Sequence, residues 1–160
     1  MSQNDDVQQV CENGHMITGP YGSKPKEQQK YCKKCGEKTI IACPNCGKEI
    51  QCDRQVIKND WGAASVPNVV PSYCPDCGEP YPWTSNKITA AIHNLMEFGD
   101  LNDEEKKTIE QDVENIAKDA PEAELSARRI KRIWERGKVV AYEIIMEFAS
   151  RTAANVLKGP

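Results

Sequence analysis

The hydrophobic positions of the chain follow two different patterns on either side of residue 84. From residue 1 to 84, apolar side chains occur in short runs such as TIIA (39–42), separated by Gly, Pro, Lys and polar residues. From residue 85 to 160, they recur at the three- and four-residue spacing of amphipathic helices. The sequence therefore predicts an α+β fold, with a domain of short β-hairpins at 1–84 and a helical domain at 85–160.

The first helix is predicted to follow the segment EPYPWTS (79–85). The two prolines exclude regular helix within this segment, and Thr84 or Ser85 then caps a helix that begins near Asn86. The apolar residues on one face of this helix are Ile88, Ile92, Leu95 and Met96. Gly99 is expected to end it.

Two further helices are predicted from the residues that precede them. Asn102 followed by Glu105 matches a capping box, which starts a second helix that runs to about Lys118. Asp119, two positions ahead of Pro121, is expected to start a third helix in the same way.

The third helix is predicted to be long. Apolar residues recur at helical spacing from Ile130 to Phe148, and only Gly137 interrupts them. Glycine inside a helix costs about 1 kcal/mol relative to alanine, which packing along an amphipathic face offsets. Whether Gly137 kinks the helix, breaks it or leaves it unchanged stays open. The second half is therefore expected to contain three or four helices.

All eight cysteines lie in the first half of the chain. Six of them form three C-x-x-C-G motifs, which begin at Cys32, Cys43 and Cys74. Two intervening residues let both thiolates reach one tetrahedral metal ion from a tight turn, and the glycine accepts a positive φ. A segment with so few large apolar side chains does not offset its conformational entropy by burial alone. Bound metal is the expected source of its stability.

A fourth pair of ligands is expected, because structural zinc takes four ligands and the three motifs supply six. The segment CENGHMI (11–17) offers this pair, and Gly14 gives the backbone freedom to turn the imidazole of His15 inward. The predicted metal ligands are Cys11, His15, Cys32, Cys35, Cys43, Cys46, Cys74 and Cys77. They are sufficient for two zinc ions. Cys52 fits no such spacing and is interpreted as a thiol on a strand, outside both sites.

The ligand pairs combine in one of two ways. Sequential pairing joins the first pair to the second and the third to the fourth, whereas a cross-braced arrangement joins the first to the third. The run TIIA between Cys35 and Cys43 fits one strand that passes from one site to the next. Sequential pairing is therefore favoured, and the cross-braced arrangement stays open as the alternative.

The paired C-x-x-C-G motifs resemble zinc ribbons, and the two pairs together resemble a double zinc ribbon over roughly residues 9 to 80. The order of ribbons and helices is similar, more loosely, to a group of bacterial zinc-ribbon proteins of unknown function. This resemblance implies metal binding and no particular activity, because ribbons serve in many classes of protein. CPNCG and CPDCG also resemble the two iron-binding turns of rubredoxins. A histidine at the first site favours zinc over that alternative.

No catalytic pattern accompanies the metal motifs. Both sites are filled by protein ligands, whereas catalytic zinc keeps an open coordination position. The other histidine, His93, is expected at the surface, and the chain has no P-loop, nucleophile elbow or dinucleotide-binding glycine pattern. We therefore expect a protein that is not an enzyme. Its ribbons would bind a protein partner, and its C-terminal helix would dock or form a homodimer.

The alternative is a nucleic-acid-binding protein, and the charge distribution bears on it. Residues 1–84 contain nine Lys/Arg and ten Asp/Glu, without the basic excess of an autonomous nucleic-acid binder. Residues 97–124 contain eleven acidic and three basic side chains, whereas residues 128–138 contain six basic and one acidic. Because neighbouring helices pack together, we expect these opposite charges largely to cancel. Nucleic-acid binding is then weak.

The N-terminal segment MSQNDDVQQV is polar and acidic, unlike a secretory or transit peptide. No apolar run approaches the roughly 20 residues that span a bilayer, so no membrane association is expected. We expect a cytoplasmic protein, whose cysteines are reduced and bind metal rather than form disulfides.

Overall fold

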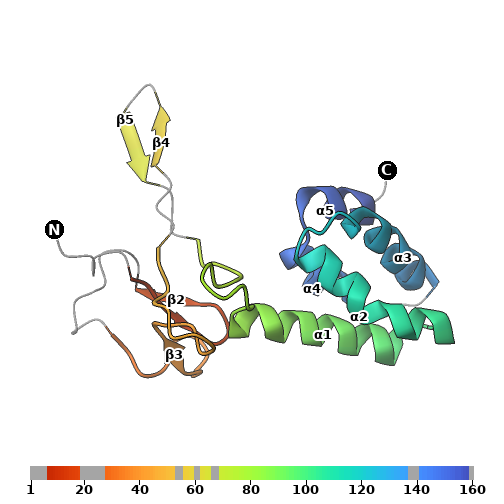
Figure 1. Ribbon diagram of the computed structural model, residues 1–160, viewed down its shortest axis with the longest axis horizontal. Coiled ribbons are helices and arrows are strands. Elements are labelled where there is room, and N and C mark those ends of the chain that lie inside the picture. Colours follow the sequence, from red (N-terminus) through yellow and green to blue (C-terminus); the bar gives the residue numbers. More distant parts are fainter. Residues whose placement is uncertain are drawn as a thin grey trace. The chain divides into compact units, whose positions relative to one another are not determined.

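The computed structural model describes residues 7–18, 28–52, 56–59, 62–65, 69–136 and 141–158. In these residues, five short strands are followed by five helices (Figure 1). This arrangement confirms the predicted α+β class with a C-terminal helical region. The chain divides into two units at Ser85, an N-terminal unit at 1–85 and a C-terminal unit at 86–160.

The N-terminal unit contains two small antiparallel sheets. The five strands are β1 (Gln9–Cys11), β2 (Met16–Thr18), β3 (Thr39–Ile40), β4 (Val56–Asn59) and β5 (Gly62–Ser65). β1 is the central strand of the first sheet, in the order β2-β1-β3, and β4 pairs with β5 in the second. Val10 of β1 is fully buried, with Met16 opposite on one side and Ile40 on the other.

The run TIIA connects the two halves of the N-terminal unit. Its first two residues form β3. Beyond them, Ala42 forms an isolated bridge with Glu49, and the carbonyl of Ile41 accepts a hydrogen bond from the Ile50 N–H at 2.8 Å. One extended segment thus pairs with β1 at its start and with residues after Cys46 at its end. This is the course that the sequence predicted.

Among the residues that the structure describes, the core of the N-terminal unit is small. Its buried members are Val10, Cys43, Ile50, Cys74, Tyr81 and Trp83. The rings of Tyr81 and Trp83 stack with their centroids 4.8 Å apart, and the Trp83 Nε1 donates a hydrogen bond to the Pro71 carbonyl at 2.8 Å. A core of this size, in which two members are cysteines, supplies little burial energy, in keeping with a fold that depends on a bound ion.

The helices are α1 (Pro82–Phe98), α2 (Asp103–Ala117), α3 (Ala123–Arg136), α4 (Ala141–Phe148) and α5 (Arg151–Lys158). The predicted start of α1 near Asn86 is wrong, because the helix already begins at Pro82. Proline is tolerated at the first helical position, where its missing N–H would have no partner in any case. The Tyr81 carbonyl accepts hydrogen bonds from the N–H groups of Thr84 and Ser85, so these two residues lie inside the helix.

The capping box at the start of α2 is confirmed. The Asn102 Oδ1 accepts a hydrogen bond from the Glu105 N–H at 2.9 Å, and the Glu105 carboxylate accepts one from the Asn102 N–H at 3.0 Å. The helix ends at Ala117, close to the predicted limit, with Lys118 as its C-cap. Gly99 follows the last residue of α1, also as predicted.

The predicted role of Asp119 is wrong. This residue has φ of 50° and ends α2, because the Ala120 N–H donates to the Asn115 carbonyl at 3.0 Å across it. Such a bond around a residue in left-handed conformation is the usual way to satisfy the last carbonyls of a helix. Asp119 therefore does not cap α3, which begins at Ala123.

The predicted total of three or four helices is also wrong, because the described residues contain five. The predicted long third helix depends on residues 137–140, between α3 and α4. Two separate helices, α4 and α5, follow α3 in the part of the chain that the structure describes. Gly137 lies outside the described residues. Ser150 separates α4 from α5, because its Oγ accepts a hydrogen bond from the Ala153 N–H at 3.2 Å and thereby caps α5.

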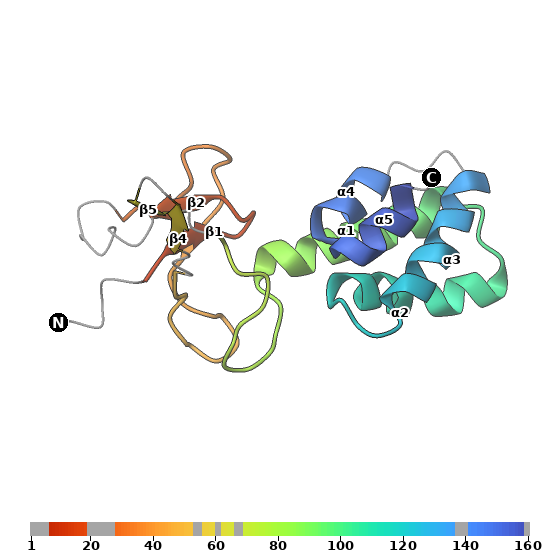
Figure 2. The ribbon, with the colours of Figure 1, turned by 90° about the horizontal axis from the view of Figure 1, so that it is seen from above.

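The C-terminal unit has a larger core than the N-terminal unit. Its fully buried aliphatic members include Leu95, Ile109, Val113, Ile116, Ile130, Ile133, Ile145 and Leu157. α3 packs against α2 and against α5, and the two views show α3 and α5 side by side (Figures 1 and 2). No helix among the described residues has both the length and the apolar character needed to cross a membrane.

Candidate metal centres

The three C-x-x-C-G motifs form the same turn. In each, the N–H of the first cysteine donates to the carbonyl five positions later, and the N–H of the glycine donates back to the carbonyl of that cysteine. The glycines Gly36, Gly47 and Gly78 have φ of 77°, 78° and 76°. A positive φ of this size is where glycine has no steric cost, so the role predicted for it is confirmed.

The segment CENGH forms a fourth turn with a related pattern. The Cys11 N–H donates to the His15 carbonyl at 3.0 Å, and the Gly14 N–H donates to the Cys11 carbonyl at 2.8 Å. Gly14 has φ of 84°. The His15 N–H donates to the Cys11 Sγ at 3.2 Å, and the Nδ1 of the same histidine lies 3.4 Å from that sulfur. The turn thus points a sulfur and an imidazole nitrogen at one place.

The first candidate centre consists of Cys11, His15, Cys32 and Cys35, whose ligand atoms all lie within 4.8 Å of one another. The Sγ atoms of Cys11 and Cys35 are 3.8 Å apart, and the Cys32 Sγ lies 3.7 Å from the His15 Nδ1. A tetrahedral ion with metal–sulfur bonds near 2.3 Å and a metal–nitrogen bond near 2.0 Å separates two sulfurs by about 3.8 Å and sulfur from nitrogen by about 3.5 Å. The spacing therefore fits one metal ion.

The second candidate centre consists of Cys43, Cys46, Cys74 and Cys77. The Sγ atoms of Cys43 and Cys77 are 3.8 Å apart, and those of Cys46 and Cys74 are 3.6 Å apart. These distances again match the edge of a metal–thiolate tetrahedron, and they exceed the roughly 2.0 Å of a disulfide bond. The two centres combine the four turns sequentially, and the cross-braced alternative is excluded for the described residues.

Local hydrogen bonds favour the thiolate form at two of the ligands. The N–H groups of Cys77 and Asp76, against the opposing effect of burial, lower the pKa of Cys74 to about 6. At Cys32, burial raises the pKa of the thiol, but the N–H groups of Lys34 and Cys35 outweigh it and lower this pKa. The opposite holds for one ligand in each centre: burial raises the pKa of Cys11, and at Cys46 the Lys48 N–H is outweighed by burial and the neighbouring cysteines, which raise the pKa to about 12. Since metals bind the thiolate and not the thiol, Cys32 and Cys74 are the two sulfurs that their turns favour for coordination.

Cys52 and His93 lie outside both centres. Cys52 is half-buried and belongs to neither group of ligand atoms. The prediction that Cys52 lies on a strand is wrong. The residue before it, Gln51, forms only an isolated bridge with Val7, and Cys52 itself belongs to no strand. His93 is exposed on α1, as expected.

Tyr81 and Trp83 belong to the surroundings of the centres, although no spacing in the sequence indicated them. Tyr81 is 1 % exposed and packs in the same cluster as Cys43 and Cys74. Burial, and the negative charge of the nearby Cys74, raise the pKa of its hydroxyl. The aromatic pair therefore packs in one cluster with two cysteines of the second centre.

Comparison with known proteins identifies the family of the chain. The chain belongs to a bacterial family, whose description is "Uncharacterized protein conserved in bacteria (DUF2321)" and whose model matches residues 4–157. No curated protein and no solved structure matches the chain. The family description names no activity, so the function has to be argued from the two centres and from the surfaces around them.

Proposed function

We propose that this bacterial protein is a cytoplasmic zinc-binding adaptor without enzymatic activity. The N-terminal unit would be a double zinc ribbon with two zinc ions per chain, and the helices would dock on a partner or form a homodimer. The observation that supports this proposal best is the pair of four-ligand groups, with ligand atoms at the spacing of tetrahedral coordination.

The donor set of the first centre supports zinc over iron. Three cysteines and one histidine are a common set for structural zinc, whereas the iron of rubredoxins has four thiolates. The second centre offers four thiolates, so the rubredoxin-like alternative applies to it alone. If zinc fills the first centre, zinc in the second centre as well requires only one kind of metal ion.

A structural role for the metal follows from the number of ligands. Four protein ligands would fill the tetrahedral shell at each centre, and they would leave no position for a water molecule or a substrate. Structural zinc sites of this kind stabilise small folds, and they present the surrounding loops to a partner. This is why we propose a binding module and not a hydrolase.

A nucleic-acid-binding function is the second candidate. Its support is the exposed surface of the turn at Cys32, where Lys33, Lys34 and Lys38 lie near Tyr31, which is 56 % exposed. Lysines beside an exposed aromatic ring suit a single-stranded nucleic acid. The net charge of −3 argues against it, and the adaptor function is therefore placed first.

Elemental analysis of protein purified without added metal tests the metal assignment. We expect two zinc ions per chain. One metal ion per chain, or iron with its red colour, would contradict the assignment.

Affinity capture from the native host then tests the adaptor role. The wild-type chain is compared with the Cys43→Ser/Cys46→Ser variant, which lacks half of the second centre. We expect a protein partner that is captured only by the wild-type chain and is retained after nuclease treatment. Capture that nuclease abolishes would support nucleic-acid binding instead.

A further inference from the structure

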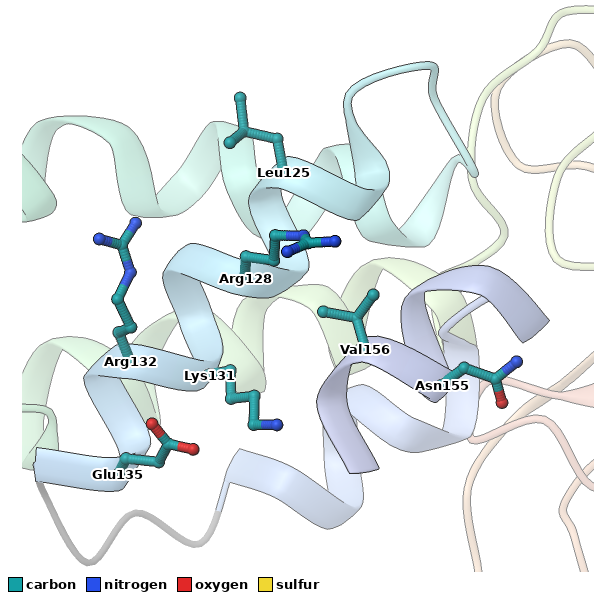
Figure 3. A pocket seen from close by; sticks show the side chains of 7 residues that line it. All are labelled: Leu125, Arg128, Lys131, Arg132, Glu135, Asn155 and Val156. Carbon is teal, nitrogen blue, oxygen red and sulfur yellow. The ribbon is translucent and has the colours of Figure 1, made fainter. Parts of the chain in front are cut away.

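A groove lies between α3 and α5 in the C-terminal unit. Its volume is about 600 Å³, within the range of small-ligand and peptide-anchor sites. The lining residues that matter here are Leu125, Arg128, Lys131, Arg132 and Glu135 from α3 and Val156 from α5. Figure 3 shows the side chains of Arg128 and Lys131 extending from α3 towards α5, where Val156 faces them.

The basic residues of α3 divide into two sets. On the side that faces α2, Arg129 bonds to Asp112 at 3.1 Å and Arg136 bonds to Glu105 at 2.6 Å. These two pairs confirm in part the predicted cancellation of charge between neighbouring helices. The other set, Arg128, Lys131 and Arg132, lines the groove. Of these three, Arg132 also lies near α2, where its charge helps to lower the pKa of Glu105.

The cations in the groove have few acidic partners. Arg128 pairs with Glu124 of the preceding turn, an exposed pair in which both side chains are at least half in solvent. Lys131 and Arg132 form no ion pair with any residue that the structure describes. Glu135 is the one carboxylate among the lining residues. The groove therefore has a net positive charge in a chain whose overall charge is −3.

The groove also has an apolar part. Leu125 is 49 % exposed, unlike the other aliphatic residues of α3, which are buried in the core. Val156 is half-buried and lines the groove from α5. The aliphatic stems of Arg128 and Lys131 extend this surface. An exposed leucine beside unpaired cations suits a ligand that is both apolar and acidic.

A short acidic peptide fits this combination better than a nucleic acid does. A phosphate backbone presents a regular row of charges and is bound by extended basic surfaces. Here the cations all lie on α3, along one side of a partly apolar groove, and the neighbouring helix α2 has a strongly acidic first turn. Peptide recognition in grooves between helices uses an apolar anchor, and charges around it set the choice of partner.

We propose that the groove between α3 and α5 binds an acidic peptide segment of a partner protein. An apolar side chain of the peptide packs on Leu125 and Val156, and its carboxylates pair with Arg128 and Lys131, the two cations that extend towards α5. The proposal rests on the adaptor function and specifies the chemistry of its partner.

The test uses the metal-loaded full chain and a fluorescein-labelled synthetic peptide, in which glutamates flank leucines at helical spacing. Fluorescence anisotropy measures binding at low and at physiological salt. Lys131→Glu should weaken binding about tenfold, because it places a like charge against the peptide carboxylates. Leu125→Ser should weaken it severalfold through loss of the apolar contact. Raising the salt should weaken binding to the wild-type chain.

Lys107→Glu is the matched control. It makes the same charge change at an exposed position of α2 that does not line the groove, and it should leave binding unchanged. A second control is a peptide with glutamine in place of glutamate, which should bind at least about tenfold more weakly. The proposal is overturned if the acidic peptide does not bind, if Lys107→Glu weakens it as much as Lys131→Glu, or if the glutamine peptide binds equally well.

Two further outcomes would assign the groove to another occupant. Tighter binding of a single-stranded oligonucleotide, lost in Lys131→Glu, would assign it to nucleic acid. A homodimer that Lys131→Glu dissociates, measured by light scattering, would assign it to a second copy. Zinc content is measured on the same samples. Two zinc ions with no peptide binding would overturn only this inference, whereas a different metal content would overturn the zinc-binding function, whatever the groove binds.

Discussion

The side chain of Trp83 lies directly against Gly14. A Cβ at position 14 would be 3.0 Å from the Trp83 Cβ and 3.2 Å from its Cγ. Gly14 belongs to the turn of the first centre, whereas Trp83 stacks on Tyr81 in the cluster that contains Cys74 of the second. One aromatic side chain therefore connects the two metal centres of the N-terminal unit.

Gly14→Ala should loosen the first centre more than Gly36→Ala does. Both glycines belong to turns of this centre, with φ of 84° and 77°, so each alanine introduces backbone strain of about 1–2 kcal/mol. Only at Gly14 does the added methyl group meet another side chain, since nothing lies within 4 Å of a Cβ at Gly36. The rate of zinc transfer to a coloured chelator measures the difference. Equal rates would show that the contact with Trp83 has no energetic role.

His15→Ala should lower the metal content or weaken binding at the first centre, because three thiolates remain where four ligands were. Cys52→Ser should leave both centres filled, since Cys52 belongs to neither group of ligand atoms. Elemental analysis of the two variants, purified side by side, distinguishes them. Loss of zinc from Cys52→Ser, with zinc retained by His15→Ala, would reverse the assignment.

Arg129→Ala should destabilise the C-terminal unit more than Arg128→Ala. Asp112 is 2 % exposed, and it accepts hydrogen bonds from the Ser126 Oγ at 2.7 Å and from Arg129. Loss of one donor to a buried carboxylate lowers the free energy of unfolding by about 1–3 kcal/mol. The exposed pair of Arg128 with Glu124 contributes about 0–1 kcal/mol. Urea unfolding of metal-loaded protein, followed by circular dichroism, gives both values. An equal loss of unfolding free energy in the two variants would mean that the burial of Asp112 does not strengthen its ion pair with Arg129.

The pKa of Glu105 should rise when Arg136 is removed. The hydrogen bond from Arg136 at 2.6 Å, together with the Asn102 N–H, holds this pKa below its ordinary value. Because the pKa is lower in the folded state, this contribution to stability is present above the ordinary carboxyl pKa and is lost as the pH falls through the folded value.

An NMR titration of the Glu105 carboxyl carbon follows this shift in the variants. Arg136→Ala should raise the pKa more than Arg132→Ala, since Arg132 acts on Glu105 through its charge and forms no hydrogen bond with it among the described contacts. A larger shift in Arg132→Ala would contradict the assignment.

The turns were predictable because each depends on a few adjacent residues. The spacing of Cys32, Cys35 and Gly36 fixes a local structure that the fold does not alter, and the capping box at Asn102 and Glu105 is equally local. A fourth ligand pair is predicted because two zinc sites need eight ligands and the three motifs supply six. The structure brings Cys11 and His15 close to Cys32 and Cys35. Their role as ligands stays a prediction until the metal is measured.

The incorrect predictions concern residue types that occur in two different structural roles. Pro82 was interpreted as an interruption, but proline also occupies the first position of a helix. Asp119 was interpreted as a cap at a helix start, but its left-handed conformation ends the preceding helix. The sequence of α3 does not specify which of its faces packs against α2. It therefore does not predict which arginines form ion pairs with that helix. The place of Trp83 between the two centres likewise follows from tertiary packing.

The β4–β5 hairpin lies between the two turns of the second centre, in the segment that joins Cys46 to Cys74. The free energy of closing a loop rises by only about 0.6 kcal/mol for each doubling of the loop length, so added residues at this place cost little. The spacing within each turn, in contrast, tolerates no change, because both sulfurs must reach one ion. The hairpin is thus a natural position at which to graft a fluorescent tag or an affinity epitope, which would leave the ends of the chain and the coordination chemistry undisturbed.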